Sequence, residues 1–263
     1  MREEILHALR QMEAEQGFKV LFACESGSRA WGFASPDSDY DVRFIYVGPM
    51  EWYLRVATDR DTCSRMLPGD LDLSGWELRK TLQLFAGCNL PLLEWLGSPV
   101  VYLDGKLAEN LRSLIPMFFN PRKAMHHCLS MAQRMAKENL GETIKIKRLF
   151  YIIRPLCACQ WIQDRATMPP TAFNALFSGC DVPSAISAQV ERYLEQKKDA
   201  VEAEAVQLNP ELADWIRARL VHFEETVSET PVPSDMPLGV LDQILYDAVT
   251  ANVAVMGTEH RHT

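Results

Sequence analysis

Three aspartates of this chain stand at spacings that could hold divalent metal ions. Asp39 and Asp41 flank the start of a predicted strand, residues 40–47, which is rich in β-branched and aromatic residues. Residues two apart on a strand face the same side, with Cα atoms roughly 6.5–7 Å apart. Carboxylates at that spacing can share metal ions about 3.5–4 Å apart, and Mg²⁺ is usually held by carboxylates together with substrate phosphates. The pair therefore predicts a metal site that receives a phosphorylated ligand.

A third carboxylate is expected to position or deprotonate the attacking group. The alternating segment over residues 70–74 offers two candidates, Asp70 and Asp72, which share a face if the segment is extended. We prefer Asp72 because it lies deeper in the apolar run. Asp70 follows Pro68-Gly69, and that sequence favours a turn. The sequence leaves the choice between the two open.

A turn of small residues precedes the aspartates. The apolar run over residues 19–23 predicts a buried strand, and it ends at Glu25-Ser26-Gly27-Ser28. Gly27 permits a tight turn and a close approach of backbone to ligand, and Ser28 offers a hydroxyl and a backbone N–H. Residues 29–33 predict a short helical piece whose N-terminus favours an anion. The turn therefore predicts a cradle for phosphates.

Candidates for contacts to the phosphorylated ligand are five cations and one tyrosine: Arg29, Arg43, Lys80, Lys147, Tyr151 and Arg154. Arg43 lies two positions after Asp41 and faces the same way, so an ion pair with the carboxylates and a phosphate contact fit the sequence equally well. Lys147, Tyr151 and Arg154 recur at i, i+4 and i+7 and share one helical face. Phosphate and nucleoside contacts are one interpretation of that face. The alternative is an amphipathic boundary with snorkelling side chains.

These residues together carry a family resemblance. Gly27-Ser28, Asp39-x-Asp41 and the acidic strand around Asp72 resemble the nucleotidyltransferase superfamily typified by DNA polymerase β. More closely, the motifs Gly-Ser-Arg-Ala-Trp-Gly at 27–32 and Ser-Asp-Tyr-Asp-Val-Arg at 38–43 are similar to the RlaP-type nucleotidyltransferases, a group linked to RNA repair. Residues 72–80, 89–102 and 147–156 carry the same resemblance, which covers roughly residues 1–180.

The resemblance implies an α+β fold, in which a nucleotidyltransferase-type mixed sheet with flanking helices is followed by a helical bundle. We expect a catalytic domain over residues 1–105 and a helical substrate-binding domain over residues 106–263. Residues 50–64 are expected as a helix or loop, and a helix over 76–85 is expected to have Ser74 as its cap and Glu77 at its third position. Periodicity predicts further helices over 1–16, 89–96, 106–115, 121–140, 143–165, 182–196, 209–227 and 237–256, with an extended linker over 231–237.

The resemblance also implies an activity. An Mg²⁺-dependent nucleotidyltransferase would use Asp39, Asp41 and Asp72 to hold two ions, with Mn²⁺ as a substitute, and would transfer NMP from a nucleoside triphosphate to an acceptor hydroxyl. An RNA or tRNA end is the acceptor that the repair link implies. The alternatives are a transferase that modifies a small molecule or a protein, and a nucleotide-binding module without chemistry. The sequence does not indicate the preferred nucleotide, the acceptor or the oligomeric state.

The composition of the chain predicts a cytoplasmic enzyme. Its 263 residues carry a net charge of −8 and are 48% hydrophobic, which is typical of globular proteins. The acidity argues against a general nucleic-acid binder, although a basic patch around Lys145, Lys147 and Arg148 could meet an RNA end. The 7 cysteines, without a signal peptide, predict reduced thiols, and no apolar run approaches the ~20 residues that cross a bilayer. His126 and His127 would point about 100° apart on a helix, which does not suit one shared metal, and their roles stay open.

Overall fold

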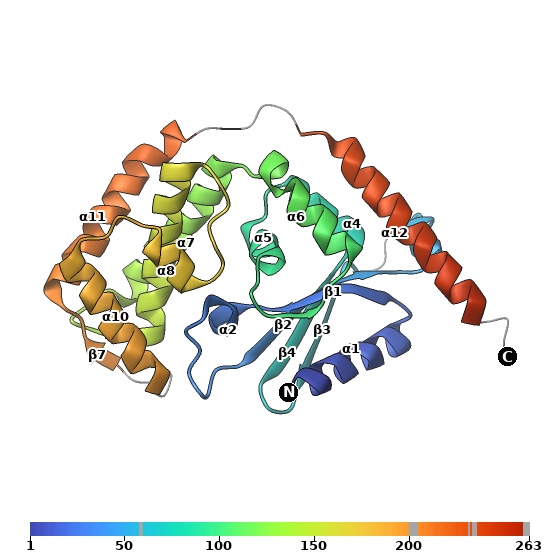
Figure 1. Cartoon of the computed structure of the whole chain (residues 1–263), viewed down its shortest axis with the longest axis horizontal. Coiled ribbons are helices and arrows are strands. Elements are labelled where there is room, and N and C mark those ends of the chain that lie inside the picture. Colours follow the sequence, from blue (N-terminus) through green and yellow to red (C-terminus); the bar gives the residue numbers. More distant parts are fainter. Residues whose placement is uncertain (58–59, 200–204, 231, 233–235, 260–263) are drawn as a thin grey trace. The chain divides into compact units, whose positions relative to one another are not determined.

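A five-stranded mixed sheet carries the predicted aspartates. The structure is a computed structural model that describes residues 1–57, 60–199, 205–230, 232 and 236–259. The strands are β1 Lys19–Glu25, β2 Tyr40–Val47, β3 Thr62–Leu67, β4 Leu71–Glu77 and β5 Val101–Leu103. They lie in the order β3–β4–β2–β1–β5 (Figure 1). β2 and β4 run parallel, and the other neighbouring pairs are antiparallel.

Strand alternation places the first polar residues of β2 and β4 on the sheet face opposite α1. Val42 and Phe44 in β2, with Leu73 in β4, are buried in a core that the helix α1 (Arg2–Gln16) covers through residues such as Leu9 and Met12. Successive strand residues point to opposite faces, so the residues between these apolar positions face the other way. The burial of one face thus dictates where the polar side chains of β2 and β4 must stand.

The chain divides into two compact units. The first comprises residues 1–27, 39–118 and the C-terminal segment from 235, and the second comprises residues 28–38 and 119–234. The remaining helices of the first unit are α3 Met50–Tyr53, α4 Leu78–Ala86, α5 Leu90–Leu96, α6 Lys106–Phe118 and α12 Leu238–Glu259. Compared with the expected boundary at residue 105, the first unit gains α6 and α12 and loses residues 28–38. The division into a catalytic and a substrate-binding domain stays a prediction.

The second unit is helical and includes a piece of the glycine-serine motif. Its elements are α7 Pro121–Asn139, β6 Thr143–Lys145, α8 Ile146–Arg165, α9 Phe173–Ser178, α10 Ser184–Asp199, β7 Ala205–Gln207, α11 Pro210–Thr226 and the 3-10 turn Val227–Glu229. The short helix α2 (Gly27–Trp31) leads into it. Phe33 stacks on Phe150 at 5.1 Å between ring centroids and meets Phe173 edge-on at 5.7 Å. These buried aromatics explain why residues 28–38 group with the helices.

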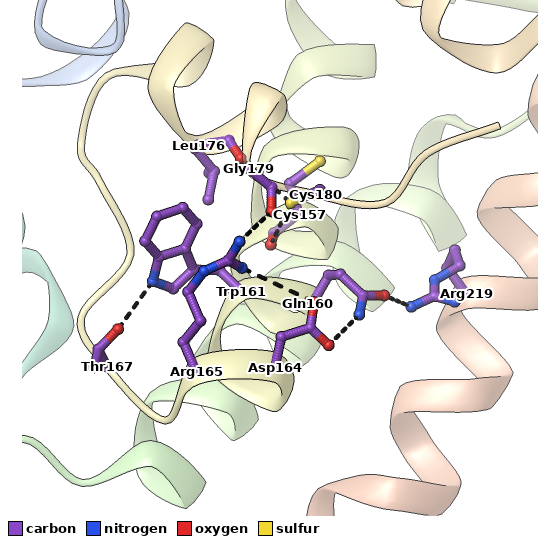
Figure 2. A network of polar contacts seen from close by, with 10 residues as sticks. All are labelled: Cys157, Gln160, Trp161, Asp164, Arg165, Thr167, Leu176, Gly179, Cys180 and Arg219. Atoms are coloured by element: carbon purple, nitrogen blue, oxygen red, sulfur yellow. Dashed lines mark hydrogen bonds and ion pairs between the residues drawn. The ribbon is translucent and has the colours of Figure 1, made fainter. Parts of the chain in front are cut away.

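A polar network joins the C-terminal end of α8 to its neighbours in the second unit (Figure 2). The Arg165 guanidinium donates to the Gly179 carbonyl at 2.7 Å and lies over the Trp161 ring at 4.1 Å from its centroid. Arg219 of α11 donates to Gln160, whose amide donates to Asp164 at 2.7 Å. These bonds connect α8, α11 and the chain just after α9.

Several elements differ from those expected from the sequence. The helix predicted over 76–85 begins at Leu78, because Ser74 and Trp76 belong to β4, in register with Arg43 and Ile45 of β2. Its cap is the Glu77 side chain rather than Ser74. The segment predicted as a helix or loop over 50–64 contains α3 and the start of the edge strand β3. Strands β6 and β7 and helix α9 were not predicted, and the predicted linker over 231–237 falls mostly outside the described residues.

Candidate active site

Two of the predicted aspartates stand side by side on the sheet face opposite α1. Asp41 in β2 is the register partner of Asp72 in the parallel strand β4, and Arg43 is the partner of Ser74 one step further. Neighbouring strands lie about 4.8 Å apart, so the two carboxylates occupy adjacent positions. Both are partly exposed, at 32% and 29% of their side-chain surface. A ligand in solvent can therefore reach them.

Arg43 bridges these two carboxylates. Its Nη2 lies 2.9 Å from Asp41 Oδ1, and its Nη1 lies 2.9 Å from Asp72 Oδ2. Nη1 also donates to the backbone carbonyls of Val42 at 3.2 Å and Asp72 at 3.3 Å. The guanidinium is 19% exposed. Of the two roles that the sequence left open for Arg43, the structure shows the ion pair.

The other two acidic candidates lie outside the strands. Asp39 is exposed and directly precedes β2. Asp70 is exposed in the turn before β4, with a positive φ of 54°, and its carbonyl accepts a hydrogen bond of 2.8 Å from the Tyr40 amide. The structure thus pairs Asp72, and not Asp70, with Asp41.

Gly27 makes room for the Asp41 carboxylate. Its φ of +60° lies in the left-handed region, and a Cβ built on it would stand 2.4 Å from Asp41 Oδ2. The preceding Ser26 amide donates to the Asp41 carbonyl at 2.8 Å. Glycine adopts this φ without steric cost, and it has no Cβ that would meet the carboxylate. The predicted turn therefore lies against the first of the paired aspartates.

Glu25 is a buried carboxylate that the sequence analysis did not single out. It is 1% exposed at the end of β1, and its Oε1 accepts a 2.7 Å hydrogen bond from the Asp41 amide. Its Oε2 accepts from the Tyr102 hydroxyl, and its carbonyl accepts from Ser98 Oγ at 2.7 Å. The buried Glu25 carboxylate thus holds the backbone of Asp41 in place. The available signal was a glutamate that ends an otherwise apolar strand.

Lys80 is placed away from these carboxylates. It lies in the first turn of α4, its amide donates to the Glu77 carboxylate at 3.2 Å, and its Nζ pairs with Asp61 Oδ1 at 3.0 Å. β4 separates Asp72 from Glu77 by five residues, or about 16 Å. The structure does not bring Lys80 to the paired aspartates, which argues against its predicted phosphate contact.

The predicted nucleotide contacts in the second unit pack among themselves. Arg154 is 3% exposed, its guanidinium lies over the Trp31 ring at 4.4 Å from the centroid, and its Nη2 donates to the Thr171 carbonyl at 3.2 Å. Tyr151 meets the same Trp31 edge-on at 5.1 Å. Lys147 is half-buried on this helix. The contacts give Arg154 and Tyr151 a packing role, and their approach to a nucleotide stays a prediction.

The remaining candidates of the second unit are either buried or bonded within the unit, or exposed on its surface. Ser28 is buried, and its carbonyl accepts from the Gly32 and Phe33 amides, each at 3.1 Å. Arg29 Nη2 donates to the Ser38 carbonyl at 2.6 Å. In the predicted basic patch, Lys145 and Arg148 are exposed and Lys147 is half-buried. The adjacent histidines of α7, His126 and His127, are both exposed. Phosphate contacts by Ser28 and Arg29 also stay predictions.

The donor set on β2 and β4 suits a divalent ion that arrives with phosphates. Within the described residues, no group of three or more His, Cys, Asp and Glu side chains is placed to hold a metal. Asp41 and Asp72 provide two carboxylates beside the Gly27 turn. Mg²⁺ is usually bound by one or two carboxylates together with substrate phosphates. The two residues therefore fit such an ion, with the phosphates completing its ligands.

Comparison with known proteins decides the family. Residues 1–247 match the family described as "RlaP: RNA repair pathway DNA polymerase beta family". The chain belongs to the RlaP family. A relative from Bacillus subtilis (strain 168), described as uncharacterized protein YcgL, is 39% identical over 251 residues, which cover 95% of this chain and 96% of the relative.

A solved structure gives a weaker likeness. It is the crystal structure of a nucleotidyltransferase-like protein from Exiguobacterium sibiricum 255-15. The match covers 85% of this chain and 74% of the other chain, with 10% identity and a TM-score of 0.33. The RlaP match confirms the predicted family, and the mixed sheet with flanking helices confirms the predicted α+β class. Membership of this family supports a general role in nucleotidyl transfer and implies a nucleotide substrate. In the described part of the chain, no helix has the length and apolar character to span a bilayer.

Proposed function

We propose that this RlaP-family protein transfers NMP from a nucleoside triphosphate to the hydroxyl of an RNA end, in a reaction that depends on Mg²⁺ or Mn²⁺. The observation that carries the proposal is the placement of Asp41 beside Asp72, with the Gly27 turn against the Asp41 carboxylate. The printed family description supplies the link to RNA repair. Asp39, directly before β2, is the third carboxylate of the proposal.

Each residue has a defined task in this reaction. Asp41 and Asp72, with Asp39, would hold the divalent cation, and the triphosphate would bind through that cation. When bound, Mg²⁺ supplies positive charge to the phosphate oxygens and lowers the pKa of the acceptor hydroxyl. The Gly27–Ser28 turn receives the β- and γ-phosphates through its backbone amides. The acceptor hydroxyl gives its proton to solvent water as its oxygen attacks the α-phosphorus in line. The new oxygen–phosphorus bond forms, and pyrophosphate leaves with the electron pair of the broken bond.

A labelling experiment tests this proposal. The purified protein is incubated with each nucleoside triphosphate, radiolabelled at the α-phosphate, together with Mg²⁺ and a mixture of tRNA, RNA fragments and protein. We expect label on RNA, and none when EDTA is present or when Asp41→Asn replaces the wild type. Label on protein instead would support the alternative modifier, and absence of label on every acceptor would contradict transfer.

Calorimetry tests the dependence on metal without an acceptor. Asp39, Asp41 and Asp72 would repel a triphosphate unless a cation lies between them, because like charges at close range repel. We therefore expect nucleoside triphosphates to bind with Mg²⁺ and to bind far more weakly in EDTA. Equal binding under both conditions would contradict a metal-mediated site.

A further inference from the structure

Arg43 occupies the place between two carboxylates where a cation would bridge them. The strand itself delivers it there: Arg43 follows Asp41 by two residues, shares its face, and lies in register beside Ser74, next to Asp72. Each Nη atom contacts a different carboxylate at 2.9 Å. A planar guanidinium presents its donors as a fixed fork, which suits the simultaneous binding of two carboxylates.

The sheet requires positive charge at this point. Like charges directly opposite on neighbouring strands destabilise a sheet, and Asp41 and Asp72 are such a pair. Arg43 removes this repulsion, and the backbone carbonyls of Val42 and Asp72 hold its Nη1 in addition. The three side chains together carry a net charge of one negative unit. A second cation placed between the same two carboxylates would meet the guanidinium at close range.

We propose that Arg43 is a resident cation that fills the bridging position between Asp41 and Asp72, so that the nucleotide-free protein lacks a divalent-ion site there. This inference rests on the proposed function for the role of these aspartates, and it departs from the two free ion positions that the sequence predicted. Asp41 uses Oδ1 for Arg43, while its Oδ2 faces Gly27.

Binding of Mn²⁺ to the nucleotide-free protein tests this inference, and it needs neither substrate nor turnover. Free Mn²⁺ is counted by electron paramagnetic resonance during titration of wild type, Arg43→Gln and the double variant Arg43→Gln/Asp72→Asn. The guanidinium of Arg43 would repel a divalent ion about 4 Å away. Its removal should therefore raise the affinity for that ion at least about tenfold. We expect Arg43→Gln to gain a Mn²⁺ site that is at least about tenfold tighter than any in wild type, and the double variant to lose it.

Thermal melts with and without Mg²⁺ provide a second readout. If Arg43 substitutes for a cation, Arg43→Gln should melt lower than wild type without metal and should recover more on addition of Mg²⁺ than wild type does. The matched control is Arg65→Gln, which removes the ion pair of Arg65 with Glu15 elsewhere in the same unit. The difference in melting temperature between Arg65→Gln and wild type should be the same with and without Mg²⁺.

The outcomes separate this inference from the proposed function. Equal Mn²⁺ affinity in wild type and Arg43→Gln, with both folded by circular dichroism, would overturn the resident-cation role and leave nucleotidyl transfer untouched. A gain of affinity that persists in Arg43→Gln/Asp72→Asn would also overturn it, because the ion would then not bridge Asp72. Conversely, a protein that transfers no NMP could still show the expected Mn²⁺ behaviour.

Discussion

Replacing Gly27 by alanine tests the close approach of the glycine turn to Asp41. Alanine at φ +60° carries a left-handed cost of about 1–2 kcal/mol, partly offset by about 0.4–1 kcal/mol from a more restricted unfolded chain. The added Cβ would also stand 2.4 Å from Asp41 Oδ2, where real contacts are essentially never under 3.0 Å. The carboxylate must therefore move by at least about 0.6 Å relative to the turn.

That movement should affect function more than stability. A shift of the Asp41 carboxylate disturbs its 2.9 Å contact with Arg43, which is worth at most about 1 kcal/mol at this exposure. Misplacement of a catalytic group by about 1 Å can cost on the order of 10²-fold in rate. We expect Gly27→Ala to lower the melting temperature by a few degrees, at about 2–4 °C per kcal/mol for a chain of roughly this size, and to reduce NMP transfer about 10²-fold.

Gly17→Ala is the matched control. Gly17 ends α1 at φ +71°, and a Cβ built on it would meet nothing within 4 Å. It should therefore show the conformational cost alone, with unchanged transfer and unchanged binding of nucleotide with Mg²⁺. Thermal melts, transfer of label and calorimetry with Mg²⁺ and a nucleoside triphosphate compare the two variants. If Gly27→Ala matched Gly17→Ala in all three measurements, the role assigned to the close approach would be refuted.

Three further substitutions or modifications have expected outcomes. Glu25→Gln should destabilise the fold by about 1–3 kcal/mol in a denaturant titration, because an amide NH₂ donor replaces one of the two charged oxygens that accept from the Asp41 amide and the Tyr102 hydroxyl; unchanged stability would contradict the network. Asp41→Asn should abolish transfer and lose no more than about 1 kcal/mol of stability, since its pair with Arg43 is partly exposed; a loss of several kcal/mol would show a mainly structural carboxylate. Iodoacetamide at pH 7.5 should alkylate Cys180 before the other cysteines, as read by peptide mass mapping, and prior labelling of a different cysteine would contradict the expected thiolate.

The expectation for Cys180 follows from its surroundings in the second unit. Its Sγ lies 3.3 Å from the backbone oxygen of Cys157 (Figure 2), and it is half-buried. The hydrogen bond from the Cys157 thiol, followed by the positive charges of Arg165 and Arg219, lowers the pKa of Cys180 against the opposing effect of burial. The same hydrogen bond and burial raise the pKa of Cys157. Because the thiolate is the nucleophile, Cys180 should react faster near neutral pH, and its advantage should shrink as the pH rises through the ordinary thiol range.

Local patterns predicted those parts of the fold in which burial and periodicity agree. Strands β1, β2 and β4 carry apolar residues on a buried face, and α1 repeats its buried positions at helical spacing. β3 was missed because it is an edge strand whose polar and apolar residues do not alternate with burial, so that only its pairing with β4 defines it. The start of α4 was misplaced for a similar reason, since pairing with β2 extends β4 through Glu77. Tertiary pairing overrode local propensity at both points.

The site shows the same limit. Asp41, Asp72 and Gly27 were predicted because strand periodicity and turn chemistry act locally, and the parallel register of β2 and β4 then brings them together. Lys80 was grouped with them because it is close to Asp72 in sequence, although the full length of β4 intervenes. Glu25 was missed because its partners lie at Asp41 and Tyr102, which only the fold brings to it.

Backbone contacts, more than charge, hold the geometry at Asp41. Its amide is bound by the buried Glu25 carboxylate, and its carbonyl is bound by the Ser26 amide. These contacts do not depend on whether the Asp41 side chain carries a charge. The Asp41 side chain can therefore take up a further cation while the strand stays in place, as the proposed function requires. The backbone contacts keep two adjacent carboxylates in a folded sheet whatever cation pairs with them.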